Sequence, residues 1–340
     1  MKSIIEKLIR QEDLTEGEMM EVMGLIMSGK VTSSQIAGFL VALRMKGETV
    51  EEIIGSAKVM KNKALNVEVE NIYAIDTCGT GGDGGNTFNV STAVAFVAAA
   101  AGIPVIKHGN RSVSSRCGSA DVLEELGINI NFTPMEVQRS VQKINIGFMY
   151  APNYHGAMKY AVTPRKELGI RTIFNILGPL TNPANVRGQV LGVFDPSLTP
   201  IMAEALRGLG VDRAMVVHGL DGLDEITITT ATKVTELKHN IISNYNIEPE
   251  RFGFPIAATE ELKGGTPQEN AEIILNIFKG EKGSKRNMVL INAGAAIYVG
   301  KGADSLEEGI EKARKVIDTG LVLNKLTEFT LFSQGVVGCS

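Results

Sequence analysis

The chain of 340 residues is 44% apolar and 21% charged, an ordinary globular composition with length for about two domains. Lys and Arg number 34 against 38 Asp and Glu, and the resulting net charge of −4 argues against a nucleic-acid-binding protein. Three cysteines and four scattered histidines are too few for a disulfide framework or a zinc site. The charged N-terminal segment is unlike a secretory signal, and the longest apolar run, 93–101, is half a membrane span. We therefore expect a cytoplasmic protein with no membrane contact.

The N-terminal residues show a helical pattern. Three times a Thr is followed three residues later by Glu or Gln, which is the signature of a capping box at a helix start. These pairs are Thr15 with Glu18, Thr32 with Gln35, and Thr49 with Glu52. Apolar residues follow each pair at helical spacing. The sequence therefore predicts a small all-helical domain over residues 1–70.

From residue 71 onward, short β-rich runs alternate with helical ones. The predicted strands are 72–76, 103–107, 189–194 and 213–218, and the predicted helices are 91–101, 119–126, one opened by 133–136, and 200–209. This alternation favours an α/β domain over 71–340, with a mostly parallel central sheet flanked by helices on both faces. Residues 220–255 are rich in Thr and β-branched residues. They are compatible with antiparallel edge strands, and their topology stays open.

A glycine-rich loop is predicted between the first strand and its helix. Five of the seven residues from Gly79 to Gly85 are glycine, and glycine lets backbone amides approach an anion closely. The loop ends in the cap-type residues Asn89, Ser91 and Thr92, at a helix start that favours phosphate. No Gly-Lys-Ser/Thr follows, so the segment is not a P-loop. A phosphate-binding loop is the interpretation that fits its position.

Two further polar clusters follow predicted strands. Residues 107–115 combine Lys107, His108, Asn110 and Arg111 with three serines, which suits phosphate and carboxylate groups. In a parallel sheet this loop would adjoin the glycine-rich one. Residues 221–225 contain the adjacent carboxylates of Asp224 and Glu225. Such a pair repels itself unless a cation is present, and hard oxygen ligands suit Mg²⁺ together with a substrate phosphate.

Four stretches in this order resemble the anthranilate phosphoribosyltransferase family. They are 79–83 with 89–92, 107–115, 165–183 and 221–225. The resemblance implies the fold of the class II nucleoside phosphorylases, with a helical domain that carries a homodimer contact. It also implies that residues from about 165 to 181 pack against the helical domain, so that Arg165 reaches the site across a hinge.

The resemblance further implies the roles of individual residues. The expected ligands of phosphoribosyl pyrophosphate are Gly79, Gly82, Asp83, Thr87, Asn89, Val90, Ser91, Thr92, Lys107, Ser115 and Ser119. Those of anthranilate are Gly79, His108, Asn110 and Arg165, and those of two Mg²⁺ ions are Ser91, Asp224 and Glu225. The role of His155 stays open, because Gly156 stands where many relatives carry Pro.

The implied reaction moves the 5-phosphoribosyl group from the pyrophosphate donor to the amine of anthranilate, in tryptophan biosynthesis. Because an aniline is largely unprotonated at neutral pH, we expect no general base, and we expect Lys107 to stabilise the leaving pyrophosphate. Two alternatives share the fold: a pyrimidine nucleoside phosphorylase and a non-enzymatic nucleic-acid-binding relative. The first does not explain the acidic pair, and the second needs a basic groove and stacking aromatics.

Overall fold

The computed structural model describes residues 1–69, 71–82, 84, 87–112 and 116–335. Four helices open the chain: α1 (Lys2–Ile9), α2 (Glu16–Met27), α3 (Ser33–Lys46) and α4 (Val50–Lys63). The three predicted capping boxes are all formed at the starts of α2, α3 and α4. Each box satisfies amides that the first helical turn leaves without partners. The predicted helix starts are therefore confirmed.

A seven-stranded sheet forms the centre of the molecule, in the order β3-β2-β1-β4-β5-β6-β7. Its strands are β1 (Ile75–Gly79), β2 (Val105–Gly109), β3 (Ile146–Tyr150), β4 (Gly188–Gly192), β5 (Arg213–Gly219), β6 (Thr232–Lys238) and β7 (Ile241–Ile247). The first five strands are parallel. The last two pair antiparallel at one edge. This confirms the mostly parallel sheet and fixes the topology that the sequence left open after residue 220.

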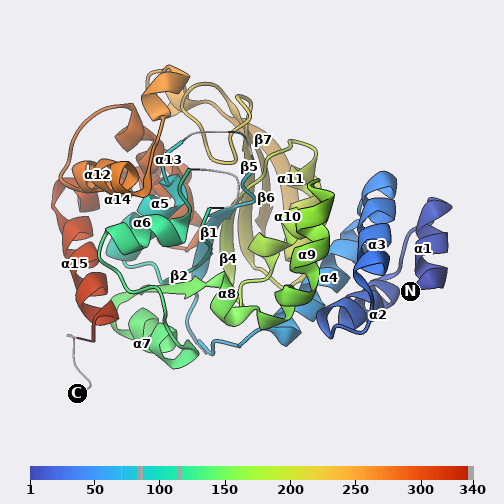
Figure 1. Ribbon diagram of the computed structural model, residues 1–340. Helices are drawn as coiled ribbons and strands as arrows, with labels where there is room; N and C mark the ends of the chain where they lie inside the picture. Colours follow the sequence, from blue (N-terminus) through green and yellow to red (C-terminus); the bar gives the residue numbers. More distant parts are fainter. Residues whose placement is uncertain (70, 83, 85–86, 113–115, 336–340) are drawn as a thin grey trace.

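The remaining helices surround the sheet (Figure 1). They are α5 (Val90–Ala100), α6 (Ser119–Glu125), α7 (Pro134–Ile144), α8 (Ala151–Tyr154), α9 (Lys159–Leu168), α10 (Phe174–Leu177), α11 (Leu198–Gly208), α12 (Pro267–Phe278), α13 (Ser284–Val299), α14 (Leu306–Asp318) and α15 (Leu321–Ser333). Single turns of 3-10 helix are η1 (Gly156–Met158), η2 (Gly178–Leu180), η3 (Pro249–Phe252) and η4 (Thr259–Leu262).

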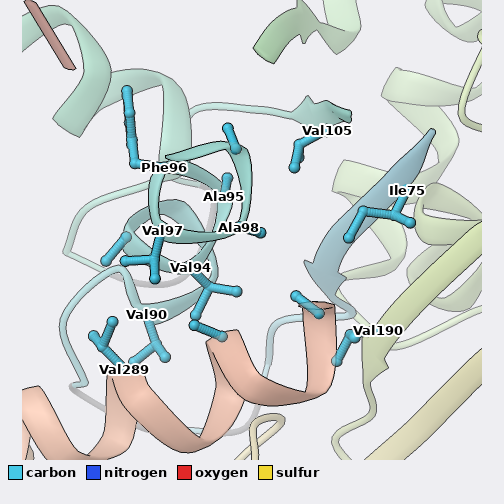
Figure 2. Packing of buried hydrophobic residues seen from close by; sticks show 14 of the residues in the cluster. Ile75, Val90, Val94, Ala95, Phe96, Val97, Ala98, Val105, Val190 and Val289 are labelled. Atoms are coloured by element: carbon cyan, nitrogen blue, oxygen red, sulfur yellow. The ribbon is translucent and has the colours of Figure 1, made fainter. Parts of the chain in front are cut away.

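Two hydrophobic clusters lie on opposite faces of the sheet. On one face, α5 and α13 pack against β1 and β4, with Val94, Val190 and Val289 in one cluster (Figure 2). On the other face, α11 packs against β5 and β6. Alternate residues of β5 serve the two clusters: Met215 belongs to the first and Val216 to the second. Alternation of this kind is what a sheet buried on both faces requires.

The second cluster also contains the N-terminal helices, which lie to one side of the sheet (Figure 1). Helix α9 packs on α2 and α3, and α10 packs on α4. Phe174 and Leu177 of α10 are buried in this cluster together with Phe39 of α3. The four opening helices thus share one core with residues 161–177 and with a face of the sheet. In the part of the chain that the structure describes, no helix has the length and apolarity needed to cross a membrane.

Some predicted boundaries are wrong. The first two strands begin at Ile75 and Val105, three and two residues later than predicted, and each continues to the glycine at its carboxyl end. Strand β3 and the four C-terminal helices α12–α15 were not predicted. Residues 146–150 form a short apolar run directly after a helix, and such a run resembles a helical continuation in sequence.

Candidate active site

The carboxyl ends of the parallel strands bring the predicted loops to one edge of the sheet. β1 is flanked by β2 and β4, and Gly79 at its end is in register with Gly192 of β4. The loops after β1, β2, β4 and β5 therefore adjoin, as expected for a ligand site in an open parallel sheet. The predicted adjacency of the glycine-rich loop and the loop after Lys107 is confirmed by the pairing of β1 with β2.

The glycine-rich loop contacts the acidic pair directly. The amide of Gly81 donates to Asp224 Oδ2 over 2.8 Å, across 143 residues of sequence. A Cβ at Gly79 would overlap the Asp224 carboxylate, and one at Gly192 would overlap the Asp224 backbone carbonyl. Glycine at both strand ends is therefore what lets the 224–225 turn lie against the sheet edge. Gly81 and Gly82 adopt positive φ, which glycine accepts without strain.

Lys107 lies under the start of α5. Its Nζ donates to the Thr77 carbonyl and, over 3.1 Å, to Ser91 Oγ. The side chain is buried, with 4% exposed. A buried ammonium needs such partners, because an unpaired one is very costly. Lys107 thus joins β1, β2 and the mouth of α5 at the place where the sequence predicts phosphate.

A buried carboxyl group, Asp76, lies beside Lys107. Asn182 Nδ2 donates to Asp76 Oδ2 over 2.8 Å and also to the Ile106 carbonyl. Burial raises the pKa of Asp76 to about 6, against the opposing effects of the Lys107 cation and the Asn182 hydrogen bond. Sequence reasoning gave no role to Asp76, which ends the first predicted strand, or to Asn182, which lies within the 165–183 stretch.

Asn89 lies at the predicted helix start, at the N-cap position of α5, but its side chain does not cap the helix. Instead, its Nδ2 donates to the Cys117 carbonyl, and its Oδ1 accepts from Asn270 Nδ2 over 3.0 Å. The buried Thr92 Oγ1 finds no partner within the described residues. The helix start therefore keeps amides and one hydroxyl available, as a phosphate site requires.

The other predicted phosphate ligands lie around this helix start. Val90 is buried at the first position of α5. Thr87 forms an isolated bridge with Lys263. Ser119, at the start of α6, donates its hydroxyl to the Asn110 carbonyl over 3.3 Å. Asp83 and Ser115 lie outside the described residues.

Two histidines lie together at the end of β2. The rings of His108 and His155 are 5.0 Å apart between centroids, and neither Nε2 atom has a partner in the described part of the chain. Burial lowers the pKa of His108 to about 3, with a further lowering by the neighbouring His155. Burial also lowers the pKa of His155 to about 4. Both rings are therefore neutral at pH 7 and present a flat, weakly polar surface.

Two arginines lie on the segment that packs on the helical bundle, and the structure shows one of them, Arg171, in contact with the glycine-rich loop. The Arg165 guanidinium lies 5.1 Å from the centre of the Phe174 ring, and burial lowers the pKa of this side chain. Arg171, which sequence reasoning missed, donates to the Gly82 carbonyl and lies 4.1 Å from the centre of the Phe194 ring. Arg111 is tied to Asp121 and Glu124 in ion pairs. Arg171 thus connects the glycine-rich loop to residues 159–177.

The oxygen atoms of the predicted metal ligands are of the chemical type that suits Mg²⁺ held jointly with a diphosphate. Asp224, Glu225 and the Ser91 hydroxyl supply hard oxygen donors, and Mg²⁺ completes its shell with water and substrate phosphate. Across 1–69, 71–82, 84, 87–112 and 116–335, no three His, Cys, Asp or Glu side chains gather into a metal site. The third carboxylate of the motif, Asp221, instead accepts from the hydroxyls of Thr227 and Thr229 and shapes the turn.

Comparison with known proteins shows the class of enzyme to which the chain belongs. Residues 71–323 match the α/β domain of the glycosyl transferase family, and residues 2–64 match that family's helical bundle domain. The anthranilate phosphoribosyltransferase of Alkaliphilus metalliredigens (strain QYMF) is 67% identical over 334 residues, which are 98% of this chain and 98% of the relative.

Two solved structures have the same fold. The enzyme of that name from Thermus thermophilus superposes with a TM-score of 0.93 at 42% identity, covering 97% of this chain and 99% of its own. The one from Saccharomyces cerevisiae, in complex with phosphoribosyl pyrophosphate and Mg, superposes with a TM-score of 0.90 at 28% identity, covering 98% of this chain and 97% of its own. The chain belongs to the anthranilate phosphoribosyltransferase family of glycosyltransferases. The comparisons do not favour the two alternatives of the same fold.

Proposed function

We propose that this chain transfers the phosphoribosyl group from phosphoribosyl pyrophosphate to anthranilate, at the sheet edge where the glycine-rich loop meets the acidic pair. The observation that carries the proposal is the hydrogen bond from the Gly81 amide to Asp224. It joins the predicted phosphate-binding loop to the predicted metal ligands in one place. The product would enter tryptophan biosynthesis.

The donor half of the site lies between α5 and the 224–225 turn. We assign phosphoribosyl pyrophosphate to Gly79, Gly82, Asp83, Thr87, Asn89, Val90, Ser91, Thr92, Lys107, Ser115 and Ser119. Breaking the bond at the anomeric carbon builds negative charge on the departing pyrophosphate. The Lys107 ammonium and the loop amides stabilise that charge, because they are fixed before it develops. Two Mg²⁺ ions, held by Ser91, Asp224 and Glu225, would supply further positive charge there when bound.

The acceptor half lies around the His108–His155 pair. Two rings that stay neutral at pH 7 can lie against an aromatic acid without adding charge. We assign the binding of anthranilate to Gly79, His108, Asn110 and Arg165. The Arg165 guanidinium would pair with the carboxylate of anthranilate. Because the anthranilate amine is already neutral, positioning it against the anomeric carbon is the main task of these residues.

We also propose how the chain is organised. Residues 1–70 form a helical domain that carries the contact of a homodimer, and residues 71–340 form the catalytic domain. Residues 165–181 move with the helical domain, which lets Arg165 approach the site across a hinge. The packing of α9 and α10 on α2, α3 and α4 supports this division. We expect the enzyme to work in the cytoplasm.

An activity assay with three substrates tests the proposal. The purified chain with Mg²⁺ and phosphoribosyl pyrophosphate should convert anthranilate to fluorescent phosphoribosyl-anthranilate. It should show no phosphorolysis of uridine or thymidine and no binding to single-stranded DNA at physiological salt. The Asp224→Asn/Glu225→Gln double variant should lose the transfer activity while remaining folded. Phosphorolysis or DNA binding in place of transfer would overturn the assignment.

A further inference from the structure

The acidic pair stands on an irregular connection between β5 and β6, yet the backbone beside it is fully hydrogen-bonded at Ile226. The Ile226 amide donates to Asn292 Oδ1 over 3.0 Å. Asn292 Nδ2 donates back to the Ile226 carbonyl over 2.7 Å. One side-chain amide therefore pairs with both backbone groups of a single residue, as a neighbouring strand would do.

Asn292 is well placed to act as a rigid support. It lies in the middle of α13, its side chain is 1% exposed, and its Nδ2 also donates to the Met288 carbonyl over 2.9 Å. A buried amide with all of these partners has one orientation, because any rotation would leave buried polar groups unpaired. Helix α13 itself packs on β1, β4 and β5, the strands that end at the site.

The support acts directly on the predicted metal ligands. Ile226 follows Glu225 in the chain. Hydrogen bonds that fix the Ile226 backbone therefore also fix the orientation of the adjoining 224–225 turn. From the other side, Gly79 and Gly192 leave no space behind Asp224, and the Gly81 amide bonds its carboxylate. The turn is thus held between the strand ends and α13.

We propose that Asn292 is a positioning residue that orients Asp224 and Glu225 for a divalent cation bound together with phosphoribosyl pyrophosphate. The inference rests on the proposed function, because it takes these two carboxylates as the cation's ligands. Asn292 itself would touch neither the cation nor the substrate. Residues that orient metal ligands in this way typically change metal affinity by about 10- to 100-fold when they are replaced.

The test measures Mn²⁺ binding in the presence of phosphoribosyl pyrophosphate, by the electron paramagnetic resonance signal of free Mn²⁺. Asn292→Leu removes both bonds to Ile226 in a side chain of similar size. We expect it to weaken Mn²⁺ binding at least about tenfold and to shift the Mg²⁺ dependence of turnover to higher concentration. Arg286→Gln is the matched control. Arg286 is buried at the start of α13, and the substitution breaks its 2.5 Å hydrogen bond to Asp318 at the end of α14. It should leave Mn²⁺ binding unchanged.

A second variant covers the case in which Asn292→Leu does not fold. Asn292→Asp keeps an acceptor for the Ile226 amide and loses the donor to its carbonyl, so we expect intermediate Mn²⁺ affinity. If either folded variant binds Mn²⁺ as tightly as the unchanged chain, the proposal is wrong. The Asp224→Asn/Glu225→Gln variant separates the role of Asn292 from the metal site itself. If the Asn292 variants and this variant all keep full Mn²⁺ affinity, the proposed metal site is wrong. If only the Asp224→Asn/Glu225→Gln variant loses affinity, the metal site stands and the role of Asn292 is wrong.

Discussion

The Lys107 ammonium lies 3.1 Å from the Ser91 hydroxyl oxygen, so a fixed positive charge stands directly beneath the first turn of α5. Helix starts already favour anions through their free amides and the helix dipole. The cation adds to that field from a position that burial and the Thr77 carbonyl hold still. This arrangement leads to the first prediction.

Replacing Lys107 should slow the chemical step. We expect Lys107→Ala to lower kcat by at least about 100-fold, the usual effect of removing one fixed group that stabilises developing charge. Lys107→Met, which keeps the length of the side chain, should lower it similarly and limit any loss of packing. Lys279→Ala, on the exposed surface of the chain, serves as the control. Turnover within a few-fold of the unchanged enzyme would rule out the leaving-group role.

Asp76 should make folding stability depend on pH. Its pKa is raised to about 6 in the folded chain from an ordinary 3.8. At a pH between these two values, the folded state therefore holds a proton that the unfolded state has lost. This contribution to the free energy of unfolding is full below pH 3.8 and is lost as pH rises through 6, by up to about 3 kcal/mol.

The measurement for Asp76 is a comparison of urea unfolding from pH 4 to pH 8. The stability of the unchanged chain relative to Asp76→Asn should fall as pH rises through this window, and it should level off above pH 7. A pH-independent difference would show that Asp76 has the same pKa in both states.

The histidine pair should not titrate in the working pH range. Because burial lowers the pKa of His108 to about 3 and that of His155 to about 4, both rings should stay neutral from pH 6 to pH 8. NMR titration of ¹⁵N-labelled histidine side chains checks this directly. A midpoint near 6.5 for His108 would contradict the neutral-ring account of the acceptor site.

Asn270 should affect the donor substrate more than the acceptor. Its Nδ2 donates to Asn89 Oδ1, and Gly264 beside it packs against the Phe88 backbone. We expect Asn270→Leu to raise the KM for phosphoribosyl pyrophosphate about tenfold, which corresponds to losing one well-placed hydrogen bond, with the KM for anthranilate unchanged. Asn276→Leu, on the same helix, is the control. Equal changes in both KM values would indicate a general loss of structure.

Gly192 should tolerate no side chain. A Cβ there would overlap the Asp224 carbonyl, so Gly192→Ala should displace the 224–225 turn and cost about 1–3 kcal/mol in stability, as overpacking usually does. We expect thermal unfolding to occur at lower temperature and activity to need more Mg²⁺. Gly17→Ala, where nothing lies within 4 Å, should change neither. Normal Mg²⁺ dependence in Gly192→Ala would show that the turn accommodates the extra atom elsewhere.

The parts of this structure that follow from neighbouring residues were predictable. Each capping box pairs side chains three residues apart, so Thr15, Thr32 and Thr49 identify their helix starts without tertiary information. The parallel direction of β1, β2, β4 and β5 follows from the alternation of strands and helices. The meeting of the glycine-rich loop with the acidic pair follows in turn from that direction, because loops after parallel strands gather at one edge.

The parts that depend on distant partners were not predictable. Asn89 has the composition of a helix cap, but its side chain is taken by Asn270, 181 residues further along the chain. Asn292 supports Ile226 from 66 residues away and sits in an apolar helix where sequence offers no reason to single it out. Asp76 became notable only when the structure showed how completely it is enclosed.

The core that α1–α4 share with α10, α11 and one face of the sheet has a practical consequence for dissecting the enzyme. Ile54 of α4 touches Gly208 of α11, and Leu191 and Val193, in and just after β4, lie in the same apolar interior. A catalytic fragment expressed without residues 1–64 would expose a broad apolar wall to water and would aggregate. Splitting the gene at this point should therefore yield working enzyme only when both pieces are produced together.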